Sequence, residues 1–497
     1  MKTQLHHATL FFLVFLLFAT SKAQNIHYVK QTGNGSGGSW ATATNNLQTA
    51  INNANDGDQV WVAAGTYFSP SSGFKMKNGV KIYGGFPATG NPIMANRNWQ
   101  TNETIISGND EWRVFNNAFT VGNPLTTTAI LDGFTIKDGK TSGVGHGGGM
   151  LNVYASPTLI NLKFIDNFAG GNGGGMMNIN ASSPILTNVE FNNNRSLAYG
   201  GGIYNSDSSA RFTNVMISNN TCTQHGGGMH NAMSTVTLTN VAIINNTGVN
   251  GGGLYNHVSA PKLTNVTISG NAAQNGGGIY NYNSPTLEIN NTIVWGNTAT
   301  SNFNSVYNSN SVPVFKYSLI QGSGGSSNWV STFGTNGGNN IDQNPNFANP
   351  ENGDFSLQQT SVAINAGSNS LYAGLVQSTL DLANNSRVYN YNSSGIIDMG
   401  AYEFQGNVLE VVNFDHKQLY KIVPNPVGKG QMTHLIIPET ASLTKIEMYS
   451  VSGQLMRQLT MSESMTQMAL PIAFPTGLYF VKCINEKGST TVKMLVE

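Results

Sequence analysis

Side chains able to carry out acid–base or metal chemistry are sparse in the central part of this chain. Between residues 147 and 300 the charged residues are Asp166, Glu190, Asp207, Glu288, Lys163, Arg195, Arg211 and Lys262. Hydrolysis by a general acid and a general base needs two facing carboxylates, and a calcium site needs several oxygen ligands, mostly from Asp or Glu. When the repeats are aligned with one another, no two carboxylates fall at matching positions on neighbouring repeats. The alignment places Lys163 beside Glu190, and we expect a surface ion pair worth under about 1 kcal/mol.

A second charged group precedes this region. Asp132, Lys137, Asp138 and Lys140 lie close together in the sequence, and a loop that ends at His146 follows them. We interpret this segment as a polar turn. His146 and His225 both precede a glycine triplet, but the repeats would place them three coils apart, or roughly 14 Å at the spacing of paired strands. The two histidines therefore cannot share a metal ion.

One column of aromatic residues is a candidate binding surface. Six times the chain reads Gly-Gly-Gly, an apolar residue, a variable residue and Asn. Because strand side chains alternate between two faces, the apolar residue should face the core and the variable residue should face outward. The variable residues are Leu151, Met177, Tyr204, His230, Tyr255 and Tyr280. Such a row would bind sugar rings by stacking, or it is an aromatic ladder that supports strand pairing by about 0.2–1 kcal/mol per pair. The ladder is the favoured interpretation.

The elements that position these residues are repeats of nearly constant length. The triplets begin at residues 147, 173, 200, 226, 251 and 276, which gives intervals of 26, 27, 26, 25 and 25 residues. A second phrase, Asn-x-x-apolar-x-x-Asn, follows each triplet, as in NLKFIDN (161–167) and NVMISNN (214–220). Each unit holds about three short strand-like stretches separated by turn residues. This pattern predicts one coil of a parallel β-helix per unit and is too short for a propeller blade.

The Gly and Asn columns that recur in the repeats have a structural explanation within this fold. Glycine tolerates a positive φ and close backbone approach, and coils would stack only about 4.8 Å apart. Asparagine also tolerates the left-handed region, and stacked Asn amides can hydrogen-bond along the axis. A phosphate cradle would need a helix after the glycines, and none is predicted there.

Composition narrows the class of protein. The 497 residues include 57 glycines, only 10% are charged, and the formal net charge is zero. Globular domains average about 25% charged residues, so the surface is expected to be polar and uncharged, as on a β-solenoid. Binding of nucleic acid would require a basic patch, and the sequence predicts none.

The ends of the chain indicate export. Residues 1–23 read as a signal peptide, with Lys2, an apolar run from Leu10 to Ala19, and Ser21-Lys22-Ala23 as a cleavage site. No later stretch reaches the roughly 18 apolar residues of a membrane-spanning helix. The two cysteines, Cys222 and Cys483, are far apart and are expected to be unpaired.

The predicted domain order is a signal peptide at 1–23, a β-helix with its caps at 24–405, a linker at 406–419, and a C-terminal domain at 420–497. In the N-terminal cap, Leu47, Ala50, Ile51 and Ala54 share one face of a short helix that would cover the open end of the solenoid. From residue 420 the strands alternate around turn signals. They predict a small antiparallel β-sandwich, so the whole chain should be all-β.

The C-terminal 78 residues resemble the C-terminal sorting domain of the type IX secretion system of Gram-negative bacteria. The resemblance rests on VPNP (423–426), VSGQLM (451–456), PTGLYFVK (475–482) and KMLVE (493–497). It implies handling by the type IX machinery, cleavage of the domain, and display at the outer-membrane surface. The residues it assigns to the sorting signal are Pro424, Asn425, Pro426, Gly453, Gly477, Tyr479, Lys482 and Lys493.

The body resembles bacterial right-handed parallel β-helix proteins with pectate-lyase-like architecture. The resemblance lies in the opening segment 28–67 and in the closing segments NPNFANPENGDFSL (344–357), SVAINAG (361–367) and IIDMGAYEF (396–404). FIDN (164–167) and FNNN (191–194) also resemble the polymorphic outer-membrane protein repeats found in adhesins. Four of the six units have Ile or Val in place of Phe, which makes this second match looser.

Two functions follow as hypotheses. The first is a non-catalytic surface protein, adhesin-like, that binds a glycan or another cell surface and needs no cofactor. The alternative is a polysaccharide lyase or glycoside hydrolase whose site is built from loops in 75–146 or 301–400. The sequence leaves open whether calcium binds in the Asn and Asp turns, and it assigns no catalytic or metal-binding residue.

Overall fold

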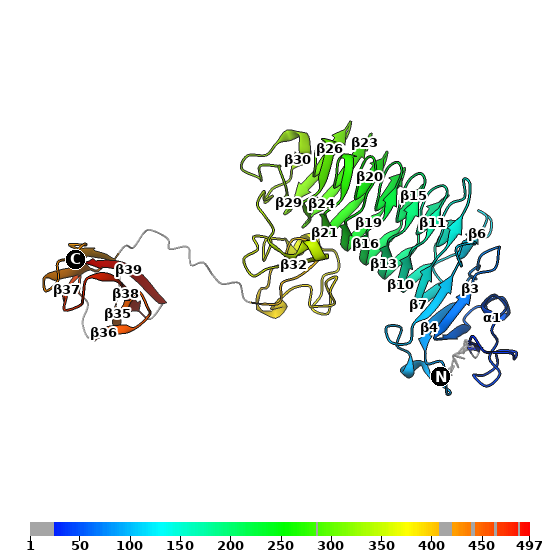
Figure 1. Cartoon of the computed structure of the whole chain (residues 1–497), viewed down its shortest axis with the longest axis horizontal. Helices are drawn as coiled ribbons and strands as arrows, with labels where there is room; N and C mark the ends of the chain where they lie inside the picture. Colours follow the sequence, from blue (N-terminus) through cyan, green and yellow to red (C-terminus); the bar gives the residue numbers. More distant parts are fainter. Residues whose placement is uncertain (1–23, 285–286, 407–419, 439–442, 462–464, 486–487) are drawn as a thin grey trace, which may run out of the picture. The chain divides into compact units, whose positions relative to one another are not determined.

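The computed structural model describes residues 24–284, 287–406, 420–438, 443–461, 465–485 and 488–497. The predicted signal peptide, and residues 407–419 of the predicted linker, lie outside these ranges. The chain divides into two compact units, Met1–Leu409 and Glu410–Glu497. The first contains a parallel β-helix and the second contains antiparallel sheets (Figure 1).

Three stacks of parallel strands form the β-helix, as the three stretches per repeat predict. We call the largest the long sheet. Its main path is β1 (Ile26–Val29), β2 (Gln59–Ala63), β4 (Lys81–Phe86), β7 (Ile130–Lys137), β10 (Thr158–Ile165), β13 (Ile185–Asn192), β16 (Arg211–Ser218), β19 (Thr237–Ile244), β21 (Lys262–Ser269), β24 (Glu288–Asn290), β28 (Val314–Lys316) and β30 (Thr335–Asn336). Beside this path lie β3 (Gly65–Phe68), β5 (Thr104–Ser107), β25 (Ile293–Trp295) and β29 (Leu319–Ile320).

The glycine-triplet phrases form a second sheet of eight strands. Its strands are β6 (Phe115–Ala118), β9 (Met150–Val153), β12 (Met176–Ile179), β15 (Ile203–Ser206), β18 (Met229–Ala232), β20 (Leu254–His257), β23 (Ile279–Tyr282) and β27 (Val306–Ser309). The third side consists of β8 (Lys140–Thr141), β11 (Phe168–Ala169), β14 (Arg195–Ser196) and β17 (Thr221–Cys222), followed by β22 (Ala272–Asn275) and β26 (Thr298–Asn302).

Apolar residues of successive coils fill the solenoid interior. Phe164 stacks on Phe191 with ring centroids 4.7 Å apart, and Leu, Ile, Val and Met side chains continue the buried cluster along the axis. At the N-terminal end, α1 (Leu47–Asn53) buries Leu47, Ala50 and Ile51, which confirms the predicted capping helix. The described cysteines are free and buried, as expected.

The Gly and Asn columns have the scaffolding roles that the repeats predict. The first glycine of every triplet has a positive φ. The final Asn of every triplet phrase is buried, and Asn178, Asn205 and Asn231 each donate to the next amide along the axis at 2.8–2.9 Å. A second buried ladder runs through Asn194, Asn220 and further coils. Both ladders satisfy polar groups inside the solenoid.

Residues 344–404, the end module, fold back along the outer face of the long sheet (yellow in Figure 1). The module contains β31 (Phe347–Asn349), η3 (Pro350–Asn352), β32 (Asp354–Leu357), η4 (Asn369–Leu371) and η5 (Tyr391–Ser393). Phe347, Phe355, Ala363 and Met399 pack against Ala242, Ile244, Ile293 and Leu319 of the sheet. The remaining short helices are η1 (Met94–Asn96) and η2 (Ser331–Phe333).

The second unit consists of two antiparallel sheets. One has the order β33 (Lys421–Val423), β34 (Met432–Ile436), β37 (Gln467–Pro471). The other has the order β36 (Leu455–Thr460), β35 (Lys445–Ser450), β38 (Gly477–Asn485), β39 (Gly488–Val496). A separate hydrophobic cluster that includes Leu435, Ile446, Val481 and Val496 joins them. The predicted small β-sandwich is therefore present.

Candidate functional site

The predicted aromatic column lies on the outer side of the eight-stranded sheet. Tyr204, His230, Tyr255 and Tyr280 occupy matching positions on successive strands. Their ring centroids are 4.8–5.1 Å apart with interplanar angles of 26–33°. Tyr307 extends the row at 4.7 Å from Tyr280. Each ring therefore presents its faces to the coil before and the coil after, along the solenoid axis.

Neighbouring rings cover much of this column. Tyr199 and His225 pack against it, and His230 and Tyr255 are only 5% and 7% exposed. Burial lowers the pKa of His230 to about 3, so this imidazole is neutral at physiological pH. Since the ring faces are occupied by other rings, the geometry favours the ladder interpretation. Sugar binding at these four residues stays a prediction.

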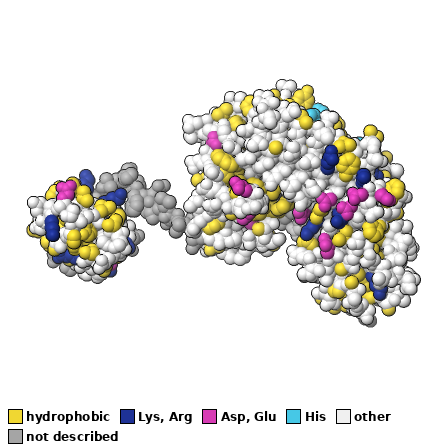
Figure 2. All heavy atoms as spheres, viewed as in Figure 1, with side chains coloured by type: hydrophobic (Ala, Val, Ile, Leu, Met, Phe, Trp, Pro, Cys, Tyr) yellow, Lys and Arg dark blue, Asp and Glu magenta, His cyan; other side chains and the backbone are white. Residues whose placement is uncertain are grey.

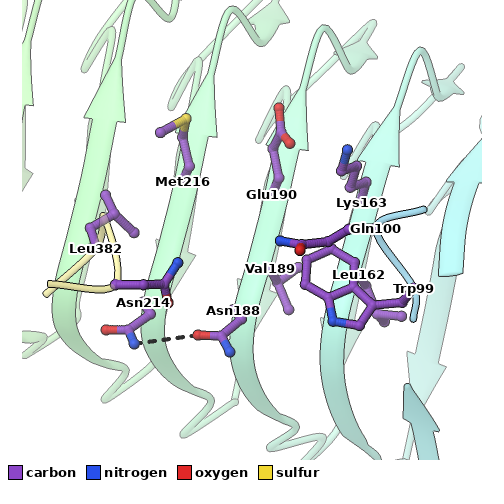
Figure 3. Close-up of a pocket in the computed structure, with 11 residues that line it drawn as sticks. Trp99, Gln100, Leu162, Lys163, Asn188, Val189, Glu190, Asn214, Met216 and Leu382 are labelled. Atoms are coloured by element: carbon purple, nitrogen blue, oxygen red, sulfur yellow. Dashed lines mark hydrogen bonds between the residues drawn. The ribbon is translucent and has the colours of Figure 1, made fainter. Parts of the chain in front are cut away.

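A groove opens on the outer face of the long sheet. Trp99 and Gln100 form one wall, Leu382 and Asn384 of the end module form the other, and the empty volume between them is about 640 Å³, part of it open to solvent. Figure 3 shows the two walls on either side of the strands. The floor consists of Leu162, Lys163, Asn188, Val189, Glu190, Asn214 and Met216.

Arg97 fixes the first wall. Its guanidinium donates to the carbonyl oxygen of Gly84 and to Asp132 Oδ1, both at 2.6 Å, and it lies 5.3 Å from the centre of the Tyr83 ring. A side chain at Gly85 would come within 2.7 Å of the Trp99 backbone. Gly85 thus permits the close approach of the segment that carries Trp99.

Asp381 fixes the second wall. Its Oδ1 accepts hydrogen bonds from the backbone N–H groups of Ala383 and Asn385 at 2.9 and 2.8 Å. Its Oδ2 accepts from the N–H of Glu403 at 2.9 Å. The loop that presents Leu382 is therefore tied to the buried centre of the end module.

The buried centre of the end module contains further ionisable side chains. Glu403 accepts two backbone N–H groups and lies 3.4 Å from Arg387, and both side chains are almost fully buried. Burial raises the pKa of Glu403, and the nearby carboxylate of Asp398 raises it further. Burial also raises the pKa of Asp398. Every carboxylate oxygen of this cluster holds a backbone donor, so the cluster organises the module.

The predicted Lys163–Glu190 ion pair is not formed. The two residues are register partners on β10 and β13, as predicted, and both side chains point outward from the strands in Figure 3. Among the described residues, however, the ion pairs within 4.0 Å include Lys262–Glu288 at 3.1 Å but not this pair. A partly exposed pair gains little free energy and loses side-chain entropy, so register alone does not enforce contact.

An amide track crosses the groove floor. It consists of the first Asn of each second phrase, and all six have φ between 48° and 55°: Asn161, Asn188, Asn214, Asn240, Asn265 and Asn291. Asn188 donates to Asn161 Oδ1 at 3.2 Å, and Asn214 donates to Asn188 Oδ1 at 3.3 Å. Figure 3 shows the second of these bonds. The left-handed corner turns each amide away from the core, toward the outer face.

The end module occupies one half of the amide track. Asn240 donates to the Tyr372 hydroxyl and the Leu380 carbonyl, both at 2.9 Å. Asn265 donates to the carbonyl oxygens of Asp398 and Gly400, at 2.8 and 3.2 Å. Asn291 donates to the Ser368 carbonyl at 3.0 Å. These three amides therefore donate hydrogen bonds to oxygen atoms of the end module, which covers this part of the sheet.

The other half of the amide track is open. Asn161, Asn188 and Asn214 each use one amide hydrogen, toward Asp132, Asn161 and Asn188 respectively. A side-chain amide has two N–H donors, so one donor on each remains for a ligand. Sequence reasoning identified these asparagines only as corner residues. Trp99 and Leu382 were missed because they come from irregular segments with no repeat.

Charged side chains on the face of the β-helix seen in Figure 2 lie mainly in one region. Figure 2 shows acidic and basic side chains gathered mainly over the first coils, while most of the rest of the solenoid face seen in this view is uncharged. Within the described residues, no three His, Cys, Asp or Glu side chains are arranged to hold a metal ion.

The predicted sorting-signal residues all lie in the second unit. Asn425 bonds to the backbone of Lys493 and Leu495 at 2.8 Å, which ties the Pro424–Pro426 segment to the terminal strand β39. Gly453 has a φ of 81° in the turn before β36, and Gly477 begins β38. Tyr479 is buried and donates to the Pro475 carbonyl. Lys482 pairs with Thr491 across β38 and β39.

The fold and the strand pairing together define a parallel β-helix with a separate C-terminal sandwich, and comparison with known families identifies the sandwich. Residues 421–497 match the family model of the secretion system C-terminal sorting domain. This domain indicates export by type IX secretion to the cell surface or extracellular space. Within the described residues, no helix combines the length and apolar character that crossing a membrane requires.

Comparison with solved structures gives distant matches to most of the chain. One is the crystal structure of pectate lyase Pel9A, with 15% identity, a TM-score of 0.46, and coverage of 77% of this chain and 97% of that one. Another is the full-length tailspike protein 2 of Escherichia coli O157:H7 bacteriophage CAB120, with 11% identity, a TM-score of 0.26, and coverage of 90% and 60%. No curated protein matches the sequence. The fold assignment therefore rests on the strand pairing described above.

Proposed function

We propose that this protein is a surface-displayed β-helix that binds an extracellular polysaccharide in the groove and holds it without cleaving it. The observation that carries this proposal is the open half of the amide track. On the same row, three chemically identical amides bind a hydroxyl and several carbonyl oxygens of the end module. Two of the open amides, Asn188 and Asn214, line the groove and have the same left-handed backbone conformation as the covered ones.

A polysaccharide suits the chemistry of this groove. Its hydroxyl oxygens accept hydrogen bonds from side-chain amides, as the Tyr372 hydroxyl does from Asn240. Trp99 offers an aromatic wall against which the C–H face of a sugar ring can pack. Lys163 and Glu190 give the floor one cation and one anion. Because the amides repeat at the strand spacing of about 4.8 Å, the contacts repeat along a chain ligand.

The second candidate is a polysaccharide lyase or glycoside hydrolase, and one observation favours it. Lys163 is a potential base in the groove, beside Glu190. A hydrolase would need a second carboxylate facing the first. Among the described lining residues Glu190 is the sole carboxylate. A binding function explains the row of amides and the Trp99 wall, whereas cleavage would use only Lys163 and Glu190.

Retention on immobilised polysaccharides tests the proposal. The full chain is applied to a panel of acidic and neutral polysaccharides, together with the variant Asn188→Gly/Asn214→Gly. Glycine tolerates the positive φ at both sites, so the change removes two donors without straining the corner. We expect retention to fall about thirtyfold, since two hydrogen bonds contribute about 1 kcal/mol each and every 1.4 kcal/mol is about tenfold in affinity.

The matched control is Asn193→Gly/Asn219→Gly. These asparagines have φ values of 55° and 57°, but they are not among the residues that line the groove. Control retention should equal that of the unaltered chain. Equal retention by the groove variant would contradict the proposed site, and new reducing ends or unsaturated uronate absorbance would show that the enzymatic alternative is correct.

A further inference from the structure

A second pocket lies on the other side of the end module, where its hairpin meets the corners of the solenoid. Asn245, Ser269 and Trp295 line it from the β-helix, and Phe347, Glu351 and Phe355 line it from the hairpin β31–β32 with η3. We call it the Trp295 pocket. Its empty volume is about 960 Å³, part of it open to solvent.

Two glycines at successive corners of the solenoid line this pocket. Earlier coils place Asp166, Asn193, Asn219 and Asn245 at this corner, each in the left-handed region. The next two coils have Gly270 and Gly296, also with positive φ. A side chain at Gly296 would have the Ser269 hydroxyl, at 3.5 Å, as its near neighbour. The Gly296 corner therefore tolerates a larger residue, whereas a Cβ at Gly270 would collide with Asn245 Oδ1. Glycine at position 296 leaves a hollow beside Trp295.

The lining combines three aromatic rings, those of Trp295, Phe347 and Phe355, with several polar side chains. Trp295 is partly buried against the apolar contact between sheet and end module. No hydrogen bond joins its indole N–H, the Asn245 amide or the Glu351 carboxylate to other described residues, and the same is true of the Ser269 hydroxyl. By contrast, Gln358 on the rim donates to the Phe347 carbonyl at 2.9 Å.

We propose that the Trp295 pocket binds a neutral sugar residue. A pyranose ring has an apolar C–H face that packs on an indole and a rim of hydroxyls that both donate and accept hydrogen bonds. Glu351 would accept from hydroxyls, Asn245 and Ser269 would do either, and the indole N–H would donate. The lining residues include no Lys, Arg or His, and a sugar carboxylate would be repelled by Glu351. The ligand class is therefore neutral rather than acidic.

This site is separate from the groove. Its lining shares no residue with the groove lining, and its ligand chemistry differs because the groove carries Lys163. Sugar binding here does not depend on polysaccharide binding there, so either proposal can fail while the other stands.

Titration calorimetry with the full chain tests the proposal, using a panel of neutral mono- and disaccharides and galacturonate. We expect a neutral sugar to bind, its affinity to fall at least tenfold in Trp295→Ala, and to fall severalfold in Glu351→Gln. Trp99→Ala, which removes the aromatic wall of the groove, should leave that affinity unchanged. Galacturonate should bind more weakly than the matching neutral sugar.

Four outcomes would overturn the proposal. The first is that no neutral sugar in the panel binds, and the second is that Trp295→Ala and Glu351→Gln bind the sugar as tightly as the unaltered chain does. The third is that Trp99→Ala loses as much affinity as Trp295→Ala, and the fourth is that galacturonate binds more tightly than the matching neutral sugar. If Trp295→Ala unfolds, as judged by its melting temperature, the exposed-residue variants Glu351→Gln and Asn245→Ala decide the matter, because neither residue belongs to the apolar contact.

Discussion

At the scale of single residues, asparagine has three roles that depend on where its side chain points. Asn220 points inward, where its amide bonds to two neighbouring coils and to the Phe191 carbonyl. Asn219, the residue before it, occupies an exposed corner with a φ of 57°. Asn214 occupies the groove floor. The same residue type thus holds the scaffold together, turns the chain and offers donors to a ligand.

This division predicts unequal costs for two adjacent substitutions. Asn220→Ala leaves buried backbone and amide groups of the neighbouring coils without partners, and each such group costs about 1–3 kcal/mol. We expect the free energy of unfolding of the β-helix unit to fall by about 3 kcal/mol or more. Asn219→Ala loses only an exposed bond and adds left-handed strain, which costs about 1 kcal/mol. Denaturant unfolding of both variants measures the difference, and similar costs would contradict the assigned roles.

The scaffold roles were predictable from spacing, but the groove was not. Glycine and asparagine at fixed intervals indicate corners and stacked amides whatever lies outside the solenoid. Asn188 and Asn240 have the same local sequence context, yet one is open and the other is covered by Tyr372 and Leu380. What separates them is a contact between residues more than 130 positions apart, and no local pattern encodes it.

At the scale of elements, the aromatic column acts as a ladder between strands. Stacked pairs such as Tyr255–Tyr280, with centroids 5.1 Å apart, join β20 to β23 through their side chains. Each pair contributes about 0.5–1.5 kcal/mol beyond its buried area. The position of this column was predictable from the repeats. Tyr199, which also packs against the column, directly precedes a glycine triplet, and the repeat pattern does not specify the residue at that position.

The variant Tyr255→Ala/Tyr280→Ala separates the two interpretations of the column. If the column is a ladder, the variant should lose about 2–4 kcal/mol of stability, because it removes several stacked contacts and leaves a gap. Its retention on polysaccharide, measured below the melting transition, should equal that of the unaltered chain. Weakened retention by the folded variant would restore the sugar-binding interpretation.

The end module is the second element whose behaviour can be predicted. Because burial raises the folded-state pKa of Glu403 above its ordinary value of 4.5, the folded chain holds that proton more tightly than the unfolded chain does. This contribution to stability is complete below pH 4.5 and declines as the pH rises through the raised folded-state pKa. We therefore expect the end module to loosen toward alkaline pH.

Hydrogen exchange of residues 344–404 at several pH values measures this effect. Exchange at the backbone N–H groups of Tyr389 and Asp398, which bond to Glu403, should accelerate as the pH rises, beyond the intrinsic pH dependence of exchange. Glu403→Gln cannot ionise and should reduce the additional slope. Glu351→Gln, at an exposed position, should leave it unchanged, and an unaltered slope in both variants would refute the assignment.

At the scale of the whole molecule, the chain combines a solenoid that has few charged residues with a sorting domain that directs it out of the cell. Repeat period and composition were enough to predict the β-helix, and motifs near the C-terminus were enough to predict the sorting domain. The sequence did not predict that the end module covers half of the amide track. The groove arises from that docking together with the Arg97-anchored wall, and each wall comes from a segment outside the regular repeats.

The most direct test of the central claim is a crystal structure of the full chain with a fragment of a polysaccharide that it retains. We expect an unbroken fragment lying in the groove, with its oxygen atoms within hydrogen-bond distance of Asn188 and Asn214 and one ring against Trp99. A fragment bound elsewhere on the β-helix unit, or one cleaved beside Lys163 and Glu190, would contradict it.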